Sequence, residues 1–152
     1  MEIHKFFSWT CVLLWMALIF YLSHQPATMS NELSTGITEV IIEKVEKITP
    51  SVEFDIRGFN HIARKNAHFF NYLILGVLVM NALRRSGMQR YRRIGLTLFI
   101  CVLYAISDET HQLFVPGRGA QVKDVFIDSS GAGVGIGIYL LFARIKKHNA
   151  IR

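Results

Sequence analysis

The sequence has only two cysteines, and it lacks the short motifs that mark many soluble enzyme sites. Cys11 and Cys101 both lie within apolar runs, so they are predicted to be small buried side chains rather than a disulfide or a metal-binding pair. There is no Cys-x-x-Cys pair, no glycine-rich phosphate loop and no Gly-x-Ser-x-Gly elbow. These absences argue against the familiar redox, nucleotide-binding and serine-hydrolase classes.

Charged residues are nearly absent from four long apolar runs, and these runs define the class of protein. Of the 152 residues, 51% are hydrophobic. An apolar run of about 20 residues can cross the hydrocarbon core of a bilayer as a helix. The sequence therefore predicts an all-α, polytopic membrane helix bundle, with one domain over residues 1–152. The expected transmembrane helices are residues 6–23, 67–83, 93–107 and 124–143.

Acidic residues are missing from two extramembrane segments, and this sets the expected orientation. Residues 84–93 hold five arginines and the tail after Ala143 holds four basic residues, without an acid in either. Because Lys and Arg favour the cytoplasmic side of a membrane, both termini and this arginine-rich connection are predicted to be cytoplasmic. The net charge of +6 then reflects topology and contact with anionic membrane lipids, not nucleic acid.

The first apolar run is not followed by the Ala-x-Ala pattern that a signal peptide needs for cleavage. We expect it to be retained as an anchor that ends at Pro26. Residues 30–50 carry apolar side chains near helical spacing, which predicts an amphipathic external segment. This segment either packs over the bundle or lies in the outer leaflet beside a lipid entrance.

Three polar residues share one face where the second apolar run begins. At about 100° per residue, Lys65, His68 and Tyr72 lie within one stripe of a helix. Polar side chains at this depth usually face a bundle interior or a wet cavity, whereas Tyr and Lys also serve as interfacial anchors. Because histidine is not a usual anchor, we favour a functional face.

The densest group of polar side chains lies between the third and fourth apolar runs. It contains two carboxylates, an imidazole, an amide, a guanidinium and two further carboxylates: Asp108, Glu109, His111, Gln112, Arg118, Asp124 and Asp128. Pro116-Gly117 predicts a tight turn that returns Arg118 to the membrane surface. We interpret this stretch as the functional site of the chain.

One face of the fourth predicted helix combines carboxylates with glycines, namely Asp124, Asp128, Gly131 and Gly135. The glycine spacing permits close approach of a second helix, so the carboxylates are expected to face a helix rather than lipid. An aspartate inside the bilayer needs a partner, and Arg118, Lys65 and Arg64 are the expected partners of Asp128.

These residues resemble the signature of the VanZ-like family. The match consists of Ser-Asp-Glu-x-His-Gln-x-Phe-x-Pro-Gly-Arg at residues 107–118 and Asp-x-x-x-Asp-x-x-Gly-x-x-x-Gly at residues 124–135. Lys65-x-x-His68-x-x-x-Tyr72 and Ser23-x-Gln25-Pro26 also match. The family is named for a protein that gives low-level teicoplanin resistance, so the resemblance implies a bacterial cell-membrane protein of the envelope. Relatives often carry Asn in place of Asp128, so no fixed charge is implied there.

Three interpretations of the polar group remain open. In an enzyme acting on an envelope lipid or lipid-linked molecule, Glu109 or Asp124 would be the general base and His68 or His111 the acid/base group. Lys65 and Arg118 would hold anionic charge, and further substrate-binding candidates are Tyr72, Asp108, Gln112 and Asp128. Alternatively, the group binds an anionic headgroup or a lipoglycopeptide without chemistry, or it is a structural polar network.

No cofactor is predicted, and a divalent metal is the less favoured alternative. Ligands could come from His68, His111, Glu109, Asp124 and Asp128. These residues are spread over three helices, without a tight local spacing such as His-x-x-x-His. Membrane lipids and a lipid-linked envelope precursor are therefore the expected partners.

Overall fold

The computed structural model describes residues 2–26 and 56–149. Four helices occupy this part of the chain: α1 (Glu2–His24), α3 (Ile56–Arg85), α4 (Arg90–Gln112) and α5 (Val122–Asn149). Each contains a segment long and apolar enough to cross a membrane. The prediction of an all-α, multi-pass membrane bundle is thus confirmed. The expected amphipathic segment at residues 30–50 lies outside the described residues.

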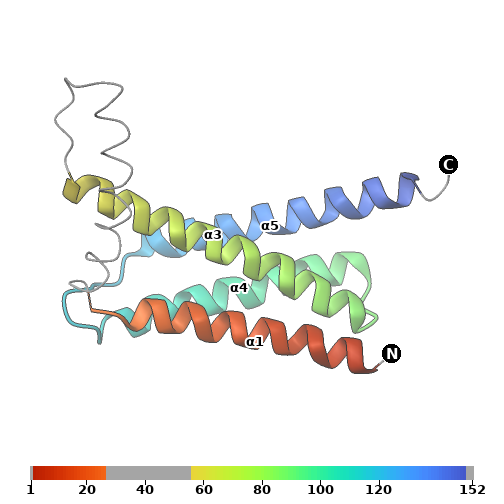
Figure 1. Ribbon diagram of the computed structural model, residues 1–152, viewed down its shortest axis with the longest axis horizontal. Helices are drawn as coiled ribbons and strands as arrows, with labels where there is room; N and C mark the ends of the chain where they lie inside the picture. The colour runs from red at the N-terminus through yellow and green to blue at the C-terminus, as the bar shows by residue number, and fades with distance from the viewer. Residues whose placement is uncertain (1, 27–55, 150–152) are drawn as a thin grey trace, which may run out of the picture.

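The four helices lie side by side along one long axis (Figure 1). α3 contacts all three other helices, and its contact with α5 is the most extensive in the bundle. The start of α1, the end of α5 and the α3–α4 turn lie at one end of the bundle (Figure 1). The end of α1, the start of α3 and the α4–α5 connection lie at the other end. The arginine-rich α3–α4 turn therefore lies at the same end of the bundle as the start of α1 and the end of α5.

The helix α4 continues past the apolar run that predicted it. The expected span ended at residue 107, whereas α4 ends at Gln112. Asp108, Glu109 and Gln112 lie in its last turns and are buried against the rest of the bundle. Because these polar side chains face protein rather than lipid, the helix extends beyond the residues that are apolar enough to be recognised.

Glycines on α5 allow its close contact with α3. A Cβ on Gly131 would collide with the carbonyl oxygen of Phe69, and a Cβ on Gly135 would collide with that of Leu73. In contrast, a Cβ on Gly133 would meet nothing within 4 Å. The predicted helix-contact face of α5 is therefore confirmed, and it brings the polar residues of α3 and α5 together.

The interior of the bundle is mostly apolar, and the two cysteines lie within or beside it. Cys101 belongs to the buried core, Cys11 is half-buried, and both are free thiols. This agrees with their predicted role as small apolar side chains. Many large apolar residues are instead exposed on the outside of the four helices, which suits a surface surrounded by lipid.

Candidate functional site

A polar cavity of about 130 Å³ lies at the end of the bundle where α3 and α5 begin and α4 ends. Seven of the ten predicted site residues line it: Lys65, His68, Glu109, Gln112, Arg118, Asp124 and Asp128. The tertiary structure therefore gathers residues from three helices and one connection. The other three predicted site residues, Tyr72, Asp108 and His111, are not part of this lining.

Lys65 and Asp124 form an ion pair between α3 and α5. The Lys65 Nζ atom lies 2.8 Å from Asp124 Oδ1, and the two side chains are 26% and 23% exposed. Lys65 had been expected among the partners of Asp128, and this expectation is wrong. The lysine instead reaches the carboxylate that lies one helical turn nearer the start of α5.

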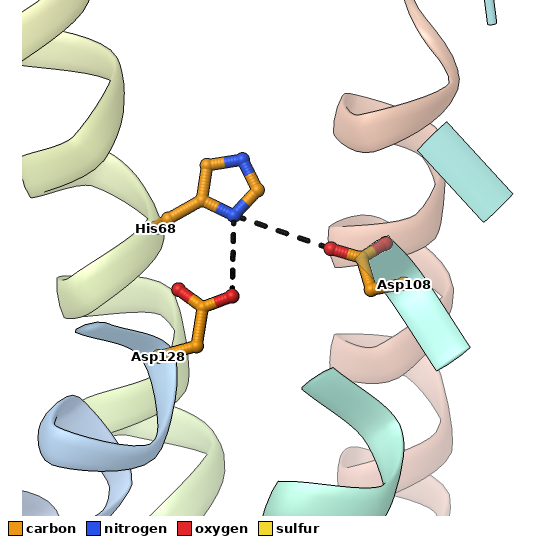
Figure 2. A group of neighbouring side chains, drawn as sticks. All are labelled: His68, Asp108 and Asp128. Carbon is orange, nitrogen blue, oxygen red and sulfur yellow. Dashed lines mark ion pairs between the residues drawn. The ribbon is translucent and has the colours of Figure 1, made fainter. Parts of the chain in front are cut away.

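A second polar contact between these helices lies deeper, around His68. Its Nδ1 atom is turned toward Asp128 on α5 and Asp108 on α4 (Figure 2). Nδ1 lies 3.7 Å from an oxygen of Asp128 and 4.0 Å from an oxygen of Asp108. Both carboxylate side chains are 0% exposed, and the imidazole is 18% exposed. We call His68, Asp108 and Asp128 the buried triad.

The buried triad is also connected to α1. The Ser23 hydroxyl donates a hydrogen bond of 2.8 Å to Asp108 Oδ2, and both residues are buried. Ser23 was not among the predicted site residues. Its signal was available in the Ser-x-Gln-Pro pattern at the end of the first apolar run, where a hydroxyl is followed by a helix-ending proline.

Several buried polar atoms at this end have no hydrogen-bond partner among the residues that the structure describes. They are both carboxylate oxygens of Asp128, Oδ1 of Asp108, Nε2 of Gln112 and Nε of Arg118. Buried polar groups in folded proteins are nearly always paired with protein or water, so each exception calls for an explanation. A network that served packing alone would leave few such atoms, because each costs about 1–3 kcal/mol.

The connection between α4 and α5 closes one side of the cavity. The backbone N–H of Gln121 donates to Glu109 Oε2 at 2.9 Å, which holds this carboxylate beside the start of α5. Gly117 has a φ of 75°, and the N–H of Arg118 bonds to the carbonyl of Val115 at 3.1 Å. The predicted tight turn at Pro116-Gly117 is therefore confirmed.

The turn places Arg118 at the cavity, where its Nη2 atom also donates to the carbonyl of Leu22 at 3.4 Å. Burial lowers the pKa of the Arg118 guanidinium from its ordinary value, and the positive charge of Arg64 lowers it further. A guanidinium nevertheless stays protonated at neutral pH. Arg64, which the sequence suggested only as a partner of Asp128, also lines the cavity.

Two predicted site residues lie elsewhere. His111 Nε2 is 3.0 Å from His24 Nδ1, and its ring lies 4.5 Å from that of Phe20, so it belongs to an outer contact between α1 and α4. Tyr72 is fully buried within the bundle, with its ring 6.1 Å from that of Tyr104. Helical periodicity correctly predicted that Tyr72 faces inward. Tyr72 lies one helical turn beyond His68, however, and does not reach the cavity.

Four membrane-length helices, three of which line a cavity with charged residues at one end of the bundle, define a multi-pass membrane protein with a polar cluster at that end. A family model described as VanZ/LLP1 matches residues 7–143. The chain therefore belongs to the VanZ/LLP1 family, as its motifs predicted. No curated protein and no solved structure matches it.

Proposed function

We propose that this protein is a membrane enzyme that acts on the anionic headgroup of an envelope lipid or lipid-linked molecule. The observation that carries the proposal is the pair of unpaired donor atoms on Gln112 and Arg118, both of which line one cavity. Unpaired groups that share a cavity are the expected partners of a bound polar group.

The cavity lining holds three basic side chains and three carboxylates, and two of the basic side chains are guanidiniums suited to an anionic group. Lys65 is already neutralised by Asp124 at 2.8 Å, so it contributes little net attraction. Arg64 and Arg118 both line the cavity. A guanidinium presents several donors in one plane and can bind two oxygens of a phosphate or carboxylate at once. Arg118 is therefore the main proposed anion-binding residue, with Arg64 beside it.

The volume of the cavity favours a small group over a large one. At about 130 Å³ it is smaller than the pockets of roughly 300–1,000 Å³ that enclose drug-sized ligands. A phosphate-sized headgroup suits this space, whereas a whole lipoglycopeptide does not. Phe114 and Val122, at the two ends of the α4–α5 connection, are 80% and 74% exposed and offer apolar contact for lipid near the cavity.

Glu109 is the proposed general base. Of the two carboxylates considered for this role, Asp124 is held by Lys65, whereas Glu109 lines the cavity with one oxygen bound by a backbone N–H. Its carboxylate is thus oriented by the protein without being neutralised by a cation. A positioned carboxylate can accept a proton from an attacking hydroxyl or water.

A non-catalytic headgroup-binding protein is the second candidate. The observation that favours it is the number of anion-binding and hydrogen-bonding atoms in the lining, which binding uses as well as catalysis does. In this case Arg118 remains essential, but Glu109 loses its special role. A connection with teicoplanin resistance would then arise from headgroups that are held at the membrane surface.

Comparative lipid profiling of expressing cells tests the proposal. Strains would carry the native protein, Glu109→Gln, Arg118→Ala or the control Lys123→Ala at matched membrane levels, since Lys123 is exposed and lies outside the cavity lining. We expect the native protein and the control to change one class of envelope lipid, and both cavity variants to lose the change. Identical lipid profiles in all strains would overturn the proposal that the protein is an enzyme.

The binding alternative has its own measurement. Lipids that remain with the purified protein would be identified by mass spectrometry, and teicoplanin susceptibility would be measured for the same strains. Lipid retained by the native protein and by Glu109→Gln, but not by Arg118→Ala, would support binding without turnover.

A further inference from the structure

The buried triad has the composition and spacing of a metal site. One ligand atom each from His68, Asp108 and Asp128 can be chosen so that all three lie within 4.8 Å of one another. They project from α3, α4 and α5, so their positions depend on helix packing rather than on a flexible loop. We propose that these three residues bind a divalent transition-metal ion.

The distances within the triad are longer than those of direct hydrogen bonds. His68 Nδ1 lies 3.7 Å from Asp128 and 4.0 Å from Asp108, whereas hydrogen bonds of this type span about 2.7–3.2 Å. The Lys65–Asp124 pair in the same protein does reach 2.8 Å. Two ligands of one tetrahedral zinc ion, each bound at about 2.1 Å, lie roughly 3.4 Å apart. The separations of 3.7 Å and 4.0 Å around His68 are somewhat longer than this, so the three side chains would draw together around a shared ion.

The charge balance of the triad also favours a cation. Two carboxylate side chains with 0% exposure face one imidazole, and when both are ionised even a protonated imidazole leaves one negative charge of the triad uncompensated. Isolated buried charges are costly unless they are paired or coordinate a metal. A divalent ion would balance both carboxylates while His68 remained neutral, as a metal-bound imidazole is.

The hydrogen bonds around the triad leave ligand positions available. Both oxygens of Asp128 and Oδ1 of Asp108 lack a hydrogen-bond partner within the described part of the chain. Ser23 donates to Oδ2 of Asp108 and so fixes the orientation of that carboxylate, as outer-shell partners of metal ligands commonly do. These unpaired carboxylate oxygens carry lone pairs that a metal ion can bind.

The ligand set narrows the choice of ion. One imidazole with two carboxylates suits Zn²⁺ or Mn²⁺, whereas Mg²⁺ and Ca²⁺ prefer sites made of oxygen alone. Since His68 and Asp128 also line the cavity, an ion would have an access route and room for additional ligands. The ion-binding proposal goes beyond the headgroup proposal and does not depend on it.

Metal binding by the purified, full-length protein tests the site. The protein in detergent would be stripped with a chelator, loaded separately with Zn²⁺ and Mn²⁺, freed of excess ion and assayed for metal by mass spectrometry. We expect roughly one ion per native chain. Asp128→Asn and His68→Gln should each weaken binding at least about tenfold, because removing a direct ligand should cost no less than removing an outer-shell partner, which typically costs about 10–100-fold.

The control is His111→Gln, which removes a histidine at the same end of the bundle but outside the triad. This variant should bind metal as the native protein does. Size-exclusion profiles and helical circular dichroism would establish that each variant is folded. Co²⁺ in place of Zn²⁺ supplies a second readout, because its visible spectrum reports nitrogen ligation and should change in His68→Gln.

The proposal is overturned if the native protein retains no more metal than Asp128→Asn, or if His111→Gln loses as much as His68→Gln. If the triad binds metal and expression changes no lipid, the metal proposal stands and the proposal of an enzyme is overturned. If the native protein binds no ion but causes a lipid change that depends on Glu109, the metal proposal is overturned and the proposal of an enzyme stands.

Discussion

Gly135 of α5 lies so close to Leu73 of α3 that a Cβ on the glycine would collide with the leucine carbonyl oxygen. The two helices approach as closely as their backbones allow at this point. Lys65 and His68 on α3 therefore come within reach of Asp124 and Asp128 on α5. The polar cluster thus depends on residues that carry no polar side chain.

Replacing Gly135 with alanine should destabilise the protein. The added Cβ meets backbone, which cannot move aside without separating α3 from α5, and overpacking of this kind costs about 1–3 kcal/mol. Gly137→Ala is the matched control, because a Cβ there would meet nothing within 4 Å. Thermal unfolding in detergent should show a lower Tm for Gly135→Ala and little change for Gly137→Ala. Equal Tm values for the two variants would contradict the close contact between α3 and α5 at Gly135.

Ser23→Ala should also destabilise the bundle. It removes the hydrogen bond of 2.8 Å to buried Asp108, and a buried acceptor left unpaired costs about 1–3 kcal/mol. Ser107→Ala changes an exposed serine next to the same aspartate and should leave the Tm unchanged. If the two variants unfolded alike, the contact between α1 and α4 through Ser23 would have no energetic role.

Lys65 and Asp124 should be energetically coupled. A double-mutant cycle with Lys65→Met and Asp124→Asn isolates their interaction, and residues in one ion pair typically couple by about 0.5–3 kcal/mol. The cycle would be measured from unfolding free energies in detergent. A parallel cycle with Lys123→Met and Asp124→Asn is the control, since Lys123 is exposed. Coupling as large in the control as in the Lys65 cycle would disprove a specific pair.

The orientation in the membrane remains a prediction that reporter fusions can check. A reporter that works only in the cytoplasm should be active when it is fused after Arg152. A reporter that works only outside the cell should be active when it is inserted at residues 30–50. The physical reason is the group of five arginines at residues 84–93, which lies at the same end of the bundle as the start of α1 and the end of α5. The opposite pattern would place the cavity on the cytoplasmic side.

Local sequence patterns were sufficient for the helices and for the inward faces. Apolar runs predicted four membrane helices, and the glycine spacing predicted which face of α5 contacts a helix. The patterns predicted α4 to be too short, because Asp108, Glu109 and Gln112 appear too polar for a membrane helix when their burial is unknown. They also could not separate His111 from His68, since both lie beside apolar runs and one of them turns outward.

The sequence by itself determined the class of protein, the four membrane-length helices of the described residues and the end of the bundle where polar groups gather. These follow from hydropathy and periodicity, which are local properties of the chain. Only the tertiary structure decided that Lys65 pairs with Asp124, that His68 faces Asp108 and Asp128, and that Ser23 contacts Asp108. Such partnerships depend on how far each helix is rotated and shifted against its neighbours, and backbone contact at the glycines sets that geometry.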